Sequence, residues 1–171
     1  MRAEASSWLM GGEIGHIGHS FIGNALCSVG GGGRLALPAF VRAGIASCFD
    51  SKTILIGVHE KDPCLIAYDR SFARALAADA QRRRIAEESS DPSAHHARAR
   101  RIFGFVAEIG LDGRGRIALP PMIQRRAQIE DKALLVGTGG AFELWSPEVA
   151  LASGDPVLVD LVAFHQLSRA A

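Results

Sequence analysis

The sequence predicts a mainly β protein with short helices, an α+β fold built from two tandem copies of one unit. Three observations support this prediction: a six-residue internal repeat, apolar strand-like runs at matching places after it, and helix-start signals that close each unit. Of the 171 residues, 48% are hydrophobic and 22% are charged. This composition suits one ordinary core or two small cores that lie close together.

The repeat is the segment Gly-Arg-Leu-Ala-Leu-Pro at residues 33–38, which returns as Gly-Arg-Ile-Ala-Leu-Pro at residues 115–120. Self-similarity at a fixed spacing indicates a duplicated structural unit. Each copy continues with a short amphipathic stretch, residues 40–45 and 122–129. A short helix fits both stretches.

Two strand-like runs follow in each copy. An apolar run that ends in glycine occurs at residues 53–57 and again at 133–137, as is typical of a strand. A second run, at residues 64–68 and 142–145, is followed by a helix-start signal, with Pro147 at a favoured first helical position. Each unit is therefore predicted to contain strand, loop, strand, short helix, strand, strand and helix.

We expect four parts along the chain. A glycine-containing tail at residues 1–19 has no convincing period and is expected to be disordered. The first unit spans residues 20–80 and the second spans residues 104–167. Between them, residues 81–103 are expected to form a basic helical connector, in which Pro92 interrupts the helix.

Composition and cysteine usage narrow the class of protein. No apolar run approaches the roughly 20 residues that span a bilayer, and a secretory signal is not evident, so we expect a cytoplasmic protein with no membrane partner. Cys27, Cys48 and Cys64 lack C-x-x-C spacing and are expected to be reduced thiols. The sequence contains no nucleophile elbow, paired-carboxylate motif or metal-ligand cluster. We therefore expect no enzyme activity, no small-molecule substrate, no cofactor and no metal.

Positive charge gathers in the middle of the chain. The net charge is only +1, yet residues 70–126 contain twelve arginines against six acids. Two runs, Arg82-Arg83-Arg84 and Arg98-Ala99-Arg100-Arg101, have two interpretations that remain open at this stage. They form either a solvated helical face or a surface for phosphate contact or subunit packing.

The loop before the second repeat has residues suited to nucleic-acid contact. Asp112-Gly113-Arg114-Gly115-Arg116 lies between two predicted strands, and its alternate glycines permit a tight turn with positive φ. We expect Asp112 to hold the Arg116 guanidinium through a bidentate pair. Arg114 is expected to project from the tip, where an arginine suits phosphate clamping and guanine recognition.

The glycines also match a weak nucleotide-binding pattern. G-x-G-x-x-A occurs at residues 31–36 and 113–118. In a dinucleotide-binding unit this region opens a helix, where Pro38 or Pro120 beyond the first turn would cost about 3 kcal/mol. Nucleotide binding is therefore the less favoured interpretation.

Together these motifs resemble the MraZ family of bacterial transcriptional regulators, whose chains carry two tandem AbrB-type units with an Asp-x-x-x-Arg loop in each. The resemblance spans roughly residues 21–167 and rests on both repeats, on Pro-Cys-Leu at residues 63–65 and on Phe-Glu-Leu-Trp at residues 142–145. It implies a pseudo-twofold split β-barrel assembled from both units and ring-like homo-oligomers. It also implies binding to double-stranded promoter DNA upstream of the cell division and cell wall gene cluster.

The resemblance assigns DNA binding in the second loop to Asp112 and Arg116, which match the motif, with Arg114 and Gly115 inside it. The chemistry of this loop is complete. It carries the orienting carboxylate, the flexible glycine and two arginines.

The first loop departs from the family pattern. Gly33 and Arg34 match it, but Gly30 stands at the aspartate position, and residues 31–32 are glycines where a polar or basic residue is usual. The first loop therefore lacks both the orienting carboxylate and a basic tip.

With this resemblance, we expect a sequence-specific DNA-binding regulator, which the family implies is a homo-oligomeric repressor of the division and wall cluster and of its own promoter, located in the cytoplasm and nucleoid. The alternative is an oligomeric protein-interaction or antitoxin-like module that has lost DNA binding through its first loop. Tyr68 and Trp145 occupy matching places in the two copies. They are expected to lie in the core or in a subunit interface.

Overall fold

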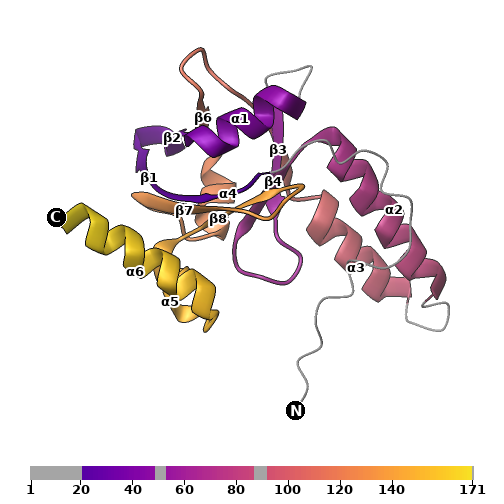
Figure 1. Cartoon of the computed structure of the whole chain (residues 1–171). Helices are drawn as coiled ribbons and strands as arrows, with labels where there is room; N and C mark the ends of the chain where they lie inside the picture. The colour runs from indigo at the N-terminus through magenta and orange to yellow at the C-terminus, as the bar shows by residue number, and fades with distance from the viewer. Residues whose placement is uncertain (1–20, 49–52, 87–91, 171) are drawn as a thin grey trace.

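The computed structural model describes residues 21–48, 53–86 and 92–170, and the tail at residues 1–19 lies outside this part of the chain. Eight strands form one antiparallel sheet in the order β5-β3-β4-β8-β7-β1-β2-β6 (Figure 1). The two outer strands, β5 and β6, are consecutive along the chain and contact each other. The sheet therefore curls into a nearly closed barrel, and the predicted α+β split barrel is confirmed.

The two copies contribute the same series of elements to the barrel. The first contributes β1 (Asn24–Gly30), the 3-10 turn η1 (Gly31–Gly33), β2 (Arg34–Ala36), α1 (Ala39–Cys48), β3 (Thr53–Val58) and β4 (Leu65–Tyr68). The second contributes β5 (Val106–Gly110), β6 (Arg116–Ala118), α4 (Pro121–Arg126), β7 (Lys132–Gly137) and β8 (Phe142–Trp145). The order of strands and helices predicted from the repeat is thus present twice.

Four further helices lie outside the barrel. Helices α2 (Arg70–Ala86) and α3 (Pro92–Phe103) occupy the segment between the copies, on one side of the barrel in Figure 1. Helices α5 (Pro147–Ala152) and α6 (Pro156–Ala170) close the described chain on another side. None of the helices in the described part of the chain has the length and apolar character needed to cross a membrane.

The strands of the two copies are interleaved. Strand β4 pairs with β8, β1 pairs with β7, and β2 pairs with its own counterpart β6. The pairings of β1 with β2, β3 with β4 and β7 with β8 stay within a copy, but β3 also pairs with β5 of the other copy. Strands β1, β2, β3 and β4 are equivalent to β5, β6, β7 and β8. Exchanging each strand for its equivalent gives the same neighbours around the barrel, so the barrel has a pseudo-twofold axis.

One core joins both copies. Completely buried side chains come from both copies, among them Leu35, Ile56, Leu119, Leu135 and Phe142. A smaller apolar cluster lies under α5 and α6, where Trp145 packs with Leu158 and Val162. Neither copy could bury these side chains alone.

The structure settles the places of the paired aromatic residues. Tyr68 is 2% exposed and Trp145 is 3% exposed, so both lie in the core of the single chain. The indole Nε1 of Trp145 donates a hydrogen bond to the Glu143 carboxylate at 2.8 Å. The prediction that these residues lie in a core or an interface is confirmed as a core position.

Candidate nucleic-acid interface

Strands β2 and β6 form a short ribbon that crosses the pseudo-twofold axis. At its centre Leu35 faces Ile117, and both side chains are buried. Side chains alternate between the two faces of a strand, so the residues before and after this central pair share the opposite face. These residues are Arg34, Ala36, Arg116 and Ala118.

The ribbon places the two repeat arginines together. Arg34 is opposite Ala118 and Arg116 is opposite Ala36, so the arginines are diagonal neighbours on the outer face. Arg34, Ala36 and Ala118 are exposed, and Arg116 is half-buried. Two arginines with only small side chains between them give this face a positive charge.

Each glycine-arginine loop is bonded to the other copy. The carbonyl of Gly33 accepts a hydrogen bond from the Leu119 amide at 2.9 Å, and that of Gly115 accepts one from the Leu37 amide at 3.1 Å. Both glycines have a φ near +70°, a backbone conformation that residues other than glycine rarely adopt. A Cβ atom at Gly33 would also collide with the Leu119 carbonyl, so the close approach of the copies requires glycine there.

In the second loop, Asp112 binds the backbone and an arginine at once. Its Oδ1 accepts hydrogen bonds from the backbone amides of Arg114 at 2.8 Å and Arg116 at 3.0 Å. Its Oδ2 accepts one from Nε of Arg116 at 2.7 Å. The predicted contact between Asp112 and Arg116 is therefore present, but the prediction that it is bidentate is wrong. One carboxylate oxygen instead accepts the backbone amides that close the turn.

Hydrogen bonding keeps Asp112 ionised. The backbone amide of Arg116, followed by its guanidinium, lowers the pKa of Asp112 from 3.8 to about 2, although the residue is exposed. At neutral pH the loop therefore holds a permanent negative charge that is satisfied internally. The outer nitrogens of Arg116 remain available to a ligand.

Arg114 and Arg34 present the other charges of this face. Both side chains are exposed, as predicted for Arg114. Within the described residues, neither guanidinium has a hydrogen bond or an ion pair, whereas that of Arg116 is held by Asp112. The structure therefore brings together Asp112, Arg114, Gly115 and Arg116 in one loop and connects them to Arg34 through the ribbon.

The first loop consists of glycines and therefore presents only backbone atoms at its surface. Gly31 and Gly32 are exposed, and a Cβ atom added to either would meet nothing within 4 Å. Gly33 is buried beneath them, against Leu119 of the other copy. The turn is well formed, but it carries no side chain that could reach a ligand.

Sequence reasoning missed one basic residue of this site. Arg42 of α1 is exposed, and its Cδ atom lies 2.8 Å from the position of a Cβ on Gly115. Nothing local connects α1 of the first copy with the loop of the second. The repeat held the only signal, because Arg42 follows Pro38 by the same interval at which Gln124 follows Pro120.

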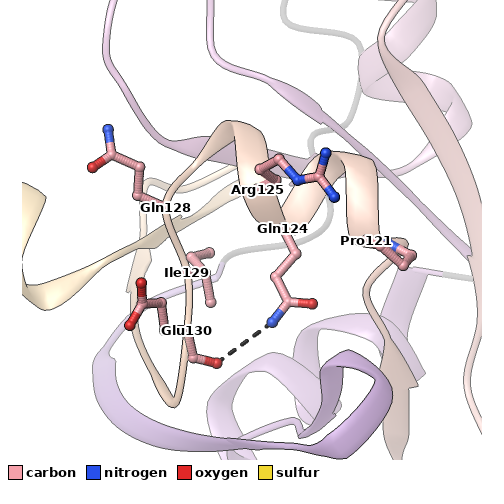
Figure 2. A pocket seen from close by; sticks show the side chains of 6 residues that line it. All are labelled: Pro121, Gln124, Arg125, Gln128, Ile129 and Glu130. Atoms are coloured by element: carbon pink, nitrogen blue, oxygen red, sulfur yellow. Dashed lines mark hydrogen bonds between the residues drawn. The ribbon is translucent and has the colours of Figure 1, made fainter.

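A shallow depression lies beside α4, at the end of the ribbon that carries the first loop. It has a volume of about 420 Å³ and is lined by Pro121, Gln124, Arg125, Gln128, Ile129 and Glu130 (Figure 2). Across its floor, Gln124 Nε2 donates to the Glu130 carbonyl at 3.4 Å (Figure 2). The lining offers one cation, one anion and neutral amides. This balanced charge distinguishes the depression from the second loop, which carries both Arg114 and Arg116.

The duplicated barrel, with a glycine-arginine loop at each end of a shared ribbon, defines a split β-barrel protein built from two tandem repeats. The chain is similar to the transcriptional regulator MraZ of Hydrogenovibrio crunogenus, with 32% identity over 138 residues, which cover 80% of this chain and 86% of that protein. The same regulator from Saccharophagus degradans is 33% identical over 134 residues, covering 78% and 86%. That from Nitrosococcus oceani is 35% identical over 117 residues, covering 68% and 74%.

No family model matches the chain. The identity and mutual coverage of these relatives are nevertheless sufficient, and the chain belongs to the MraZ family of transcriptional regulators. The resemblance inferred from the repeats is confirmed. The relatives carry the name of a regulator rather than of an enzyme.

Proposed function

We propose that this regulator binds double-stranded promoter DNA in a sequence-specific manner and represses transcription. The observation that supports this most directly is the outer face of the β2–β6 ribbon. There Arg34 and Arg116 lie diagonally across the two strands, with only Ala36 and Ala118 between them. Small side chains allow a DNA backbone to approach closely, and arginines suit both phosphates and guanine.

The second loop is the part of this face that would read sequence. Asp112 holds the turn and Nε of Arg116, which reduces the ordering cost when the loop meets DNA. Arg114, whose guanidinium is free of protein partners within the described residues, would extend from the same turn. Phosphate contacts would supply much of the affinity, and base contacts by Arg114 or Arg116 would supply the specificity.

The family relationship supports a particular DNA target and a particular oligomeric state. The target would be the promoter region of the cell division and cell wall gene cluster, including the regulator's own promoter, and the protein would work in the cytoplasm and nucleoid. A ring-like homo-oligomer would present several identical faces to one DNA molecule. Linked weak contacts gain effective concentration when the geometry lets them engage together, which would compensate for the bare first loop.

A titration followed by fluorescence anisotropy tests the proposal. The purified protein is titrated with its own upstream DNA and with a scrambled duplex, at two salt concentrations. We expect preference for the upstream DNA, and an affinity that falls steeply with salt because counterions are released from neutralised phosphates. Equal, weak binding to both duplexes would contradict DNA recognition.

Replacing Arg116 by alanine tests the named site. We expect Arg116→Ala to abolish the preference for upstream DNA while the thermal midpoint stays close to that of the wild type, because the guanidinium is partly exposed and its loss leaves the apolar core intact. Arg74→Ala, at an exposed arginine of α2, serves as the control and should retain the preference. An Arg116→Ala protein with undiminished preference would overturn the assignment.

A second candidate function is a protein-interaction module without DNA binding. The bare first loop favours it, as do exposed apolar side chains on α6, where Val157 is 62%, Phe164 61% and Leu167 73% exposed. A variant whose first loop carries the acidic and basic residues of the family pattern would distinguish the two functions. Lys at position 32 would be strained because Gly32 has a φ of +72°, so the variant is better built as Gly30→Asp with Gly31→Lys.

The expected outcomes of that variant differ clearly. If the wild type already binds upstream DNA, Gly30→Asp with Gly31→Lys should bind it more tightly. If the wild type binds no DNA and the variant does, the protein is an interaction module whose first loop has decayed. Gly31→Ala is the matched control, since its Cβ meets nothing within 4 Å and adds no charge.

A further inference from the structure

Each loop glycine is covered by a side chain from the helix of the other copy. A Cβ atom on Gly115 would lie 2.8 Å from Cδ and 3.6 Å from Cγ of Arg42, which belongs to α1. A Cβ atom on Gly33 would lie 3.0 Å from Oε1 of Gln124, which belongs to α4. Arg42 and Gln124 also stand at matching distances after the prolines of the repeat. The pseudo-twofold axis therefore makes them equivalent positions.

The two equivalent side chains differ in charge and in engagement. Gln124 is neutral, half-buried and hydrogen-bonded to the Glu130 carbonyl at 3.4 Å (Figure 2). Arg42 is exposed, and its aliphatic stem lies on the Gly115 backbone. In the described part of the chain, no carboxylate or carbonyl partner occupies the Arg42 guanidinium, whose charge therefore remains available.

Arg42 adds a third positive charge to the second loop. Arg114 and Arg116 belong to the loop itself, and its one carboxylate, Asp112, is committed to the turn and to Arg116. Like charges brought together repel one another unless an anion binds among them. The excess positive charge at this end of the ribbon thus favours a phosphate-bearing ligand.

We propose that Arg42 contacts a phosphate of the DNA backbone, so that the arginine site of each subunit is shared by the two copies. This inference rests on the proposed DNA binding. Arg42 comes from the helix beside the loop rather than from its tip, and its stem is fixed against Gly115. Its contact therefore adds affinity and positions the loop, while discrimination between bases stays with the loop arginines.

Anisotropy titrations of the full chain test this role, with upstream and scrambled duplexes over a series of salt concentrations. Arg42→Gln gives the first copy the residue of the second. We expect it to raise the Kd about tenfold for both duplexes and to lower the slope of log K against log salt by about 0.9, the value for one lost phosphate contact. The preference for upstream DNA should remain.

Two matched variants separate charge from packing. Arg42→Met keeps an apolar stem over Gly115 but removes the charge, and it should bind as poorly as Arg42→Gln at an unchanged thermal midpoint. Gln124→Met makes the same replacement at the equivalent position and should leave the salt slope unchanged. Wild-type affinity in Arg42→Met, with a loss only in Arg42→Gln, would show that packing matters instead and would overturn the inference.

The failure of this inference can be distinguished from the failure of the proposed function. If the wild type shows no preference for upstream DNA, the proposed function fails before any Arg42 variant is compared. If the wild type shows the preference and Arg42→Gln keeps the same Kd and salt slope, the inference alone is overturned.

Discussion

At the scale of single residues, the Asp112 carboxylate makes three hydrogen bonds within the second loop. One oxygen accepts two backbone amides and the other accepts Nε of Arg116. The same group therefore shapes the turn and orients an arginine. An asparagine could accept the backbone bonds but would lose the ionic contact, because its amide nitrogen donates rather than accepts.

The pH dependence of Asp112 follows from its hydrogen bonds. The folded pKa of about 2 lies below the ordinary value of 3.8, so the stabilisation from the ionised group is fully present above pH 4. It is lost as the pH falls through 2. We expect an NMR titration of the Asp112 carboxyl carbon to show a midpoint near 2, and a midpoint near 3.8 would contradict the hydrogen bonding described.

A second residue, Gln128, has a backbone conformation that lowers the stability of the protein. Gln128 follows α4 with a φ of +54°, the one positive value among the non-glycine residues described. Left-handed backbone after a helix favours glycine, because other residues bring Cβ close to a carbonyl oxygen. We expect Gln128→Gly to raise the free energy of unfolding by about 0.5–1 kcal/mol, and the thermal midpoint by about 1–4 °C.

The control for Gln128→Gly is the same change inside a helix. Gln81 is an exposed residue of α2, where glycine is unfavourable by about 1 kcal/mol relative to alanine. Gln81→Gly should therefore lower the helix content or the midpoint. If both variants behaved alike in melts followed by circular dichroism, the left-handed cap would not be the cause.

At the scale of elements, the Glu60 carboxylate joins both α2 and α3 to the barrel, in addition to the ion pair at 2.7 Å between Arg70 of α2 and Glu108 of β5. Glu60, in the loop between β3 and β4, lies 3.3 Å from Nε of Arg98 and 3.9 Å from Nη1 of Arg83. Helix α2 has no buried residue. The two arginine runs are therefore partly explained as ion-pairing residues, while Arg84, Arg100 and Arg101 remain exposed.

This arrangement predicts a local effect of Glu60→Gln. Removing the charge should increase hydrogen exchange in α2 and α3 while the thermal midpoint of the barrel hardly changes, because exposed ion pairs contribute about 0–1 kcal/mol. Asp62→Asn in the same loop is the control, since the Asp62 carboxylate lies 3.1 Å from Nδ1 of His59 rather than beside a helix arginine. Equal protection of both helices in wild type and Glu60→Gln would contradict the link.

At the scale of the whole molecule, the interleaving of strands makes the two copies one folding unit. Strands β1, β2 and β4 of the first copy pair with β7, β6 and β8 of the second. Each copy alone would expose long strand edges and half of a core. The β2–β6 ribbon also needs both copies, since each copy supplies one of its strands.

Fragments of the chain test this unity. We expect residues 21–103 and residues 104–171, expressed separately, to lack the dispersed NMR spectrum of a folded protein, because their strands have lost their partners. Mixing the fragments should restore it. A folded fragment 104–171 by itself would show that the second copy is an independent domain.

Much of this protein was readable from local sequence signals. The repeat, the order of the elements and the loop from Asp112 to Arg116 follow from hydrophobic periodicity and from the turn chemistry of glycine and proline. These signals act over a few residues. They also identified the family, because the same short motifs recur in order and twice.

The tertiary structure decided what lies together. The pairing of β2 with β6 places Arg34 and Arg116 on one face, the turn takes one oxygen of Asp112, and α1 carries Arg42 onto Gly115. Strand pairing and register between distant segments depend on which apolar faces are buried together. The sequence by itself thus determined the elements and the chemistry of one loop, whereas burial of a core shared by both copies assembled the surface that the arginines form.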